Sequence, residues 1–248
     1  DHGIYGAVER VSDHLIQPES GKPRQILWRI YAAKTILAAG ATERPIAFEN
    51  NDRPGIMLAS AIRSYANRWA ATPAQRIAIF TNNDDGHRTA TDLHAAGVKI
   101  AAVIDTRADA PRSLDYEVLQ GAQVTDTKGR LGLSFAEVEL ADGSMRTIEC
   151  NAMGVSGGWN PNVHLTCHQR GRPTWDDGLA AFVPGEILPP GMSVTGAALG
   201  HLSTHGALEN GVKAAKTALG LKGRTAKLPS AEDAPVTQTP FWYVEGCS

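Results

Sequence analysis

Apolar and polar residues alternate near the beginning of the chain, over residues 6–11 and again over residues 25–37. A period of two places every second side chain on the same face of a strand, so both runs predict strands. The polar stretch between them, residues 17–24, predicts the loop of a small antiparallel hairpin. The second run ends in small residues at 38–41, where another backbone or a ligand can come close.

The spacing of apolar residues changes at residue 57 and predicts a helix over residues 57–69, which ends before Pro73. We expect an apolar strand at residues 76–80, a helix at 85–96 that ends at Gly97, and a buried strand at 98–104 that ends at Asp105. A strand, a helix and a second strand of these lengths indicate the β-α-β unit of nucleotide-binding folds.

The second half of the chain begins with a predicted helix at residues 114–119 and continues with strands at 122–124, 131–140 and 146–150. Residues 159–190 contain proline, glycine and tryptophan without a regular period, and we expect the chain to cross between domains there. A strand at 192–198, a helix at 202–219 and a polar linker at 225–239 complete the pattern.

The composition allows two domains and argues against several classes of protein. The 248 residues are 42% hydrophobic and 20% charged, and the net charge of -2 gives no general attraction to nucleic acid. Three cysteines without a CxxC pair fit a reducing cytosol better than a secreted disulfide framework. No apolar run reaches membrane-spanning length, so we expect a cytoplasmic protein without a membrane partner. Both ends look cut, and the chain is expected to be a piece of a longer protein.

The turn of the predicted β-α-β unit carries Asn82, Asn83, Asp84 and Asp85 where a dinucleotide fingerprint has glycines. Glycines let a pyrophosphate approach the backbone, whereas these residues add side chains and negative charge. Because Asn and Asp also cap helices well, the sequence favours a structural turn here. Asp105 ends the next strand, where such folds place an acid that binds a ribose hydroxyl, or where the residue only forms a turn.

The strand end at residues 193–200, with the sequence SVTGAALG, is a better candidate for a binding site. Its small residues let backbone N–H groups face a phosphate or ribose, or else only let strand and helix pack closely. His164, Cys167 and His168 match no zinc-ligand spacing and are interpreted as surface residues, and Cys150 as a core residue. We identify no catalytic residue and no metal site in the sequence.

Five motifs resemble the large subunit of heterotetrameric sarcosine oxidase. They are GATERP at residues 40–45, ENNDRPGIML at 49–58, TNND at 81–84, VSGGWNP at 155–161 and AAFVPG at 180–185. Together they extend the resemblance over nearly the whole chain. The resemblance implies the α/β fold of the pyridine nucleotide-disulfide oxidoreductases, with two Rossmann-like FAD/NAD(P)-binding domains, the second inserted in the first, and antiparallel β-meanders.

The resemblance also implies where the domains and the cofactor lie. Residues 1–72 and 153–223 would form the NAD-binding domain, whose glycine fingerprint would lie upstream of Asp1. Residues 73–152 would form the inserted nucleotide-binding-type domain, of reduced binding role, and residues 224–248 a linker toward a folate-binding domain. The residues implied to lie at the NAD site are Gly40, Ala41, Gly196, Ala197, Leu202 and Thr204.

The activity that the resemblance implies belongs to a multisubunit oxidoreductase. It is the oxidative demethylation of sarcosine with oxygen and tetrahydrofolate by a heterotetramer, in which FAD and FMN lie mainly on other subunits or are shared with them. The isolated chain is expected to be inactive. Two other interpretations stay open: an FAD-binding subunit of an opine oxidase or a hydrogen cyanide synthase-like dehydrogenase, and a non-catalytic dinucleotide-binding scaffold.

Overall fold

The computed structural model describes residues 3–223, 227–231 and 236–241. The chain divides into two compact units. Unit 1 consists of Asp1–Gly40, Pro161–Trp175 and Phe182–Asp233, and unit 2 consists of Ala41–Asn160, Asp176–Ala181 and Ala234–Ser248. The short strands β13 (Trp159–Pro161), β14 (Thr174–Asp176) and β15 (Ala181–Val183) lie where the chain passes between the two.

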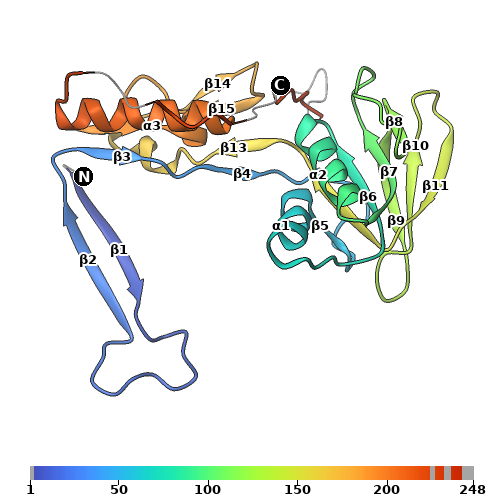
Figure 1. Cartoon of the computed structure of the whole chain (residues 1–248), viewed down its shortest axis with the longest axis horizontal. Coiled ribbons are helices and arrows are strands. Elements are labelled where there is room, and N and C mark those ends of the chain that lie inside the picture. The colour runs from blue at the N-terminus through green and yellow to red at the C-terminus, as the bar shows by residue number, and fades with distance from the viewer. Residues whose placement is uncertain (1–2, 224–226, 232–235, 242–248) are drawn as a thin grey trace. The chain divides into compact units, whose positions relative to one another are not determined.

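Unit 1 begins with the predicted hairpin, which is confirmed. Strands β1 (Ile4–Arg10) and β2 (Gln25–Tyr31) pair antiparallel, from Ile4 opposite Tyr31 to Arg10 opposite Gln25, and they form the long blue ribbon of Figure 1. The predicted run at 25–37 is interrupted at residues 32–34, so that β3 (Thr35–Leu37) is a separate strand. It pairs in parallel with β16 (Met192–Val194).

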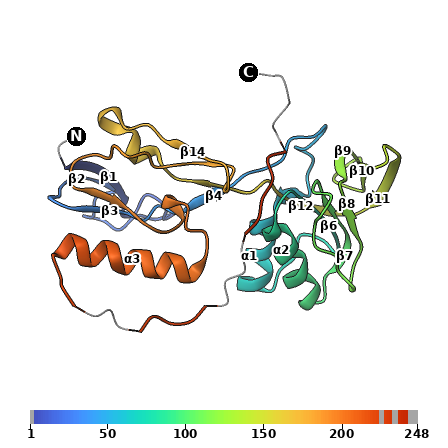
Figure 2. The same ribbon diagram turned by 90° about the horizontal axis from the view of Figure 1, so that it is seen from above.

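The rest of unit 1 packs around a small apolar core of Leu37, Met192, Val194 and Ala198. Helix α3 (Thr204–Leu219) confirms the predicted C-terminal helix, and Figure 2 shows it beside β3. The Oγ of Ser203 accepts a hydrogen bond from the Gly206 N–H at 3.0 Å and thereby caps the first turn. Two short 3-10 segments, η1 (His164–Arg170), which is kinked at His168 and Gln169, and η2 (Gly196–Leu199), complete this unit.

Unit 2 contains a five-stranded, all-parallel sheet. Its strands are β5 (Ile56–Leu58), β12 (Ala152–Ser156), β6 (Arg76–Thr81), β7 (Lys99–Asp105) and β8 (Val118–Gln120), in that spatial order. Helices α1 (Ala59–Trp69) and α2 (Asp84–Ala95) connect β5 to β6 and β6 to β7. The predicted β-α-β unit is therefore confirmed.

The two faces of this sheet are covered by different layers, as Figures 1 and 2 show. Ile77 and Ile79 of β6 pack with apolar residues of α1 and α2, while the alternate residues Ala78 and Phe80 face the other side. There they pack against an antiparallel meander of β9 (Gln123–Lys128), β10 (Phe135–Glu139) and β11 (Met145–Glu149). The result is a helix layer, a parallel sheet and a meander stacked on one another.

One predicted element is wrong, and several are shorter than predicted. The helix predicted at residues 114–119 is absent, because Val118–Gln120 pairs in parallel with β7 and extends the edge of the sheet instead. Val118 and Leu119 gain more from this pairing than from one or two isolated helical turns, which are marginal in water. The strand predicted at 131–140 begins only at Phe135. The strand predicted at 192–198 ends at Val194, with η2 following from Gly196, and the helix predicted from residue 57 begins at Ala59.

The compact units have other boundaries than the domains predicted to divide at residues 72 and 153. Strand β12 pairs with both β5 and β6, so that residues 56–58 and 152–156 complete the sheet of unit 2. Part of the predicted linker also belongs to this unit, because residues 236–241 bond to the carboxyl edge of the same sheet. The dinucleotide-binding roles assigned to the domains remain predictions.

The contact between α2 and β6 depends on Gly86. A Cβ placed on Gly86 would lie 2.4 Å from Oγ1 and 2.5 Å from Cβ of the fully buried Thr81. We expect Gly86→Ala to lower the free energy of unfolding by about 1–2 kcal/mol, because overpacking outweighs the gain in helix propensity. Urea denaturation followed by circular dichroism measures this, and Gly6→Ala, with no atom within 4 Å of the added Cβ, is the control. An unchanged midpoint for Gly86→Ala would contradict the proposed close packing.

Candidate functional site

Two carboxyl strand ends meet in unit 1 at the predicted binding site. Because β3 and β16 are parallel, both end at the same edge, and the N–H of Thr195 donates to the Leu37 carbonyl at 3.0 Å. Gly196 follows Thr195 directly and starts η2, and Gly40 lies three residues beyond the end of β3. Carboxyl ends of parallel strands are where α/β folds bind ligands. The structure therefore brings the two predicted segments to one edge.

Both glycines of this edge have left-handed backbone conformations, with φ of 71° at Gly40 and 65° at Gly196. A Cβ on Gly40 would meet no atom within 4 Å, and one on Gly196 would be 3.7 Å from Ala207 of α3. Glycine is favoured at both positions because the backbone is left-handed there, and not because a side chain would lack space. Asn162 holds the segment at Gly40: its N–H donates to the Gly40 carbonyl at 3.0 Å and its Nδ2 to the Ala39 carbonyl at 2.9 Å.

The other predicted site residues fall into two groups. Ala197 and Leu202 are half-buried in and after η2, and Thr204 is the exposed first residue of α3, so these three follow Gly196 within unit 1. Ala41 begins strand β4 (Ala41–Glu43) and belongs to unit 2. The structure thus groups Gly196, Ala197, Leu202 and Thr204 together and assigns Ala41 to the other unit.

Sequence reasoning missed Thr195 as an individual residue of this edge. Its side chain is 5% exposed, and its Oγ1 has no hydrogen-bond partner among the described residues. This oxygen would lie 3.9 Å from a Cβ on Gly211, and therefore faces α3. A buried hydroxyl without a partner costs about 1–3 kcal/mol, so a partner from outside the described residues would stabilise it. The signal in the sequence is a hydroxyl residue placed between an apolar strand and Gly196.

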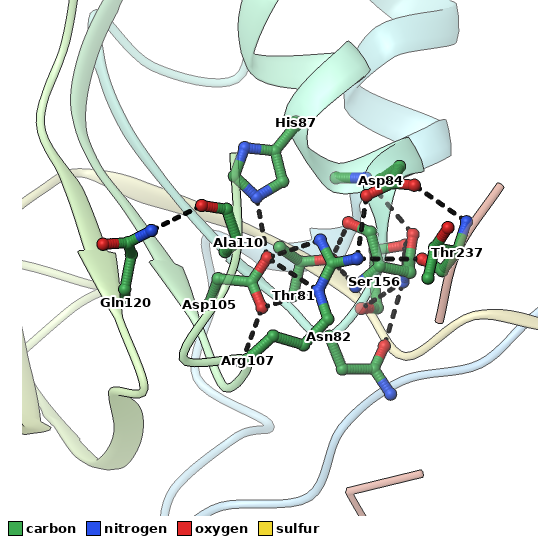
Figure 3. Close-up of polar contacts among 12 residues, drawn as sticks. Thr81, Asn82, Asp84, His87, Asp105, Arg107, Ala110, Gln120, Ser156 and Thr237 are labelled. Carbon is green, nitrogen blue, oxygen red and sulfur yellow. Dashed lines mark hydrogen bonds and ion pairs between the residues drawn. The ribbon is translucent and has the colours of Figure 1, made fainter. Parts of the chain in front are cut away.

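The turn after β6 in unit 2 is the second candidate site, and its residues bond to the chain itself (Figure 3). Asn83 is fully buried and caps α2, since its Oδ1 accepts the N–H groups of Asp85 at 2.9 Å and Gly86 at 3.3 Å. Its Nδ2 donates to the carbonyl of Ser156 at 2.9 Å. These contacts agree with the structural turn that the sequence favours.

Asp105, at the end of β7, uses both carboxylate oxygens within the protein. Its Oδ1 accepts the backbone N–H of Arg107 at 2.9 Å, and its Oδ2 accepts Nη2 of Arg107 at 2.8 Å. The ring Nε2 of His87 lies 2.7 Å from the same Oδ2. Burial acts to raise the pKa of Asp105, but the hydrogen bonds from His87 and Arg107 and the charge of Arg107 hold it below its ordinary value. These bonds favour the structural interpretation of Asp105 over the ribose-binding one.

Three of the motifs that carry the family resemblance meet at Arg44, within unit 2. Its Nε donates to the Gly157 carbonyl at 3.1 Å, and its Nη1 donates to Oδ1 of Asn160 at 3.0 Å and to the Ala180 carbonyl at 2.8 Å. Burial lowers the pKa of Arg44 to about 10. Separate motifs of the sequence therefore form one junction.

The preceding residue of the same motif, Glu43, supplies the start of α1 with the cap that the helix's own residues lack. Its Oε2 accepts the N–H of Ser60 at 2.9 Å, and burial raises the pKa of this carboxyl group. The N-cap position, Leu58, has no side chain that can accept such a bond.

The cysteines and histidines follow the sequence-based interpretation where the structure describes them. Cys150 is fully buried, and burial raises the pKa of its thiol to about 11, as expected of a core residue. Cys167 is exposed within η1.

Among the described residues, no helix has the length and apolar character needed to span a membrane.

Comparison with known sequences confirms the resemblance seen in the motifs. No family model matches the chain. The sarcosine oxidase alpha subunit of Rhizobium meliloti is 38% identical over 260 residues, which cover 99% of this chain and 25% of the relative. That of Corynebacterium sp. strain P-1 is 37% identical over 256 residues, 96% of this chain and 26% of the relative. The chain spans about a quarter of the length of these relatives.

Solved structures confirm the predicted Rossmann-like α/β fold. An L-proline dehydrogenase from P. horikoshii has a TM-score of 0.60 at 17% identity, over 80% of this chain and 37% of that one. A thioredoxin reductase from Lactococcus lactis has a TM-score of 0.57 at 14% identity, over 88% of this chain and 75% of that one. At these identities the likeness shows the fold, with its parallel sheet and antiparallel strand pairs.

The buried carboxylate of Asp105 predicts a defined dependence of stability on pH. We expect Asp105→Asn to cost about 3–5 kcal/mol at pH 7, because it leaves Arg107 without its buried counter-charge. Since the pKa of Asp105 is lowered from 3.8 in the folded protein, its contribution is present above that value and is lost as the pH falls through the folded pKa. Urea unfolding between pH 7 and pH 3 should therefore show the difference from the unchanged chain shrinking below about pH 4. A difference that does not vary with pH would contradict this.

Proposed function

We propose, from the match to sarcosine oxidase alpha subunits over nearly the whole chain, that this protein is part of the alpha subunit of a sarcosine oxidase. Identities of 36–38% over 96–99% of the chain support an oxidoreductase role of this kind. The junction at Arg44 supports it further, because the motifs that identify the family build one connected structure.

In this proposal, unit 1 holds NAD at the edge where β3 and β16 end. The buried Oγ1 of Thr195, without a partner among the described residues, is the observation that carries this placement. A ribose or phosphate oxygen of a dinucleotide would supply the missing partner, and the absence of side chains at Gly40 and Gly196 lets a ligand come close to the backbone beside it. Ala197, Leu202 and Thr204 would contribute the adjoining surface. When bound, NAD supplies a group that can accept a hydride, and these residues bind and orient it.

The complete enzyme would act beyond this chain. We propose that it oxidatively demethylates sarcosine with oxygen and tetrahydrofolate as a cytoplasmic heterotetramer, in which FAD and FMN lie mainly on other subunits or are shared with them. No residue of this chain is assigned a catalytic role, and the isolated chain is expected to be inactive. Its contribution is to bind the nucleotide and to support the assembly.

Two other functions compete with this proposal. An FAD-binding subunit of an opine oxidase or hydrogen cyanide synthase-like dehydrogenase would have FAD at the same edge, and thioredoxin reductases and related enzymes share this fold. A non-catalytic scaffold would keep a nucleotide that is never reduced during turnover. Mass spectrometry of the small molecules released on denaturation separates the first two, since NAD supports our proposal and FAD the alternative. Mass spectrometry of the nucleotide released from the full enzyme after addition of sarcosine would distinguish NAD from NADH and so test the scaffold.

The role of Thr195 can be tested by Thr195→Val, which removes the hydroxyl and keeps the shape. We expect the NAD content of the purified chain to fall by up to about tenfold, the effect of one lost hydrogen bond. The matched control is Thr217→Val, on an exposed position of α3. If Thr195→Val instead keeps its NAD content and gains thermal stability, the hydroxyl has only a packing role and the placement of NAD is wrong.

A further inference from the structure

Residues 237–239 lie against the turn that follows β6, and the contact is made largely through their backbone. Figure 3 shows Thr237 beside Asp84. The N–H of Thr237 donates to the Asp84 carboxylate at 2.8 Å, and its carbonyl accepts the Asp84 N–H at 3.1 Å. The N–H of Thr239 donates to the Asn82 carbonyl at 3.1 Å, and its carbonyl accepts Nδ2 of Asn82 at 2.7 Å. Bonding of every second residue through both backbone groups is the pattern of a strand added to a partner.

The N–H groups that would hold a phosphate in this fold are already used. Dinucleotide phosphates bind at the first turn of the helix that follows the first strand of the β-α-β unit. At this position, Asn83 accepts the N–H groups of Asp85 and Gly86, and the N–H of Asp84 is bonded to Thr237. All three donors are committed to groups of the chain itself.

The charges of the turn also favour a peptide over a phosphate. Asp84 and Asp85 place two carboxylates in the first turn of α2, where they would repel a phosphate. Arg107 does not offset this repulsion, because its guanidinium is bonded to Asp105 and Asp84. Its Nη1 also donates to the carbonyl of Thr237 at 3.0 Å. The uncharged backbone of Thr237 bonds to both Arg107 and Asp84 without adding charge, whereas a phosphate would add negative charge beside the two carboxylates.

The shape of the neighbouring strand end fits the same segment. A Cβ on Gly158 would lie 2.2 Å from Oε1 of Gln238, so the glycine makes room for this side chain. Gln238 itself is 7% exposed. Phe241 extends the contact, with its ring edge-on to Phe80 at a centroid distance of 6.1 Å. Gly158, just after the end of β12, therefore gives the chain's own glutamine the space that a side chain would fill.

We propose that the turn of residues 81–84, together with Arg107 and Gly158, is a peptide clamp. Its ligand is residues 237–239 of the same chain, which it binds in place of a dinucleotide. On this basis Asn82 and Asp84 are not remnants of a lost phosphate site: their side chains and backbones recognise the two backbone groups of Thr239 and Thr237. The clamp ties the downstream chain to unit 2. This inference is independent of the NAD site proposed in unit 1.

Hydrogen-exchange mass spectrometry of the purified chain tests the clamp through a peptide that covers residues 236–241. We expect Asp84→Ala and Asn82→Ala to speed exchange there by about tenfold or more, because each removes a side-chain bond to the segment. Asp109→Ala and Asn151→Ala, at exposed positions, are the matched controls. Thr239→Pro removes a backbone donor from the segment and leaves the turn itself unchanged, and Ser230→Pro is its control. This variant keeps the test independent of how well the turn variants fold.

A second arm asks whether the clamp takes nucleotide as well. Millimolar NAD or ATP added to the unchanged chain should leave exchange over residues 236–241 as it was, because their phosphates find no free donors in the turn. Faster exchange on addition of either nucleotide would show displacement of the segment and overturn the proposal, as would unchanged exchange in both Asp84→Ala and Thr239→Pro. The NAD content of the chain, measured separately after denaturation, reports on the site in unit 1 and not on the clamp.

Discussion

A carboxylate with no exposure to solvent needs its counter-charge inside the protein, and Asp105 imposes this condition on the whole carboxyl edge of unit 2. Arg107 satisfies it from two residues away, and its remaining guanidinium nitrogen reaches Asp84 and the carbonyl of Thr237. One buried charge therefore connects the end of β7, the start of α2 and the downstream segment. An edge built in this way is complete without a nucleotide, which is unusual for a sheet of this type.

Elements whose side chains alternate or repeat within a short window could be predicted from the sequence. The hairpin β1–β2, helices α1, α2 and α3 and the meander all carry such patterns, and each lies close to its predicted residues. The prediction failed at residues 114–119, where three residues join a sheet that is assembled from distant parts of the chain. The compact units divide elsewhere than at residues 72 and 153, because β12 lies between β5 and β6 in the sheet although it follows both in the sequence, and nothing local in its sequence specifies those neighbours.

The candidate sites, too, could be predicted only where the relevant residues are close together in the sequence. Small residues at Gly40 and Gly196 can be seen in the sequence, and the parallel pairing of β3 with β16 places both segments at one edge. The case for Thr195 depends on its burial and on its lack of a hydrogen-bond partner among the described residues, which can be seen only in the structure. In unit 2 the unusual residues of the turn were visible, and the loss of phosphate donors could be anticipated from them. Their partner could not, because Thr239 lies 157 positions beyond Asn82 and within a stretch whose composition is that of a linker.

Because residues 237–239 lie far downstream of the turn after β6, they become available to it only late in synthesis. The ribosome delivers the chain from its N-terminus, so β5 to β12 emerge and can pack their core well before residue 237 is synthesised. During the synthesis of the intervening residues, the backbone groups of the turn after β6 are solvated by water. The segment that finally replaces this water is synthesised after every strand and helix that the structure describes, so closure of the edge is a late step in biosynthesis.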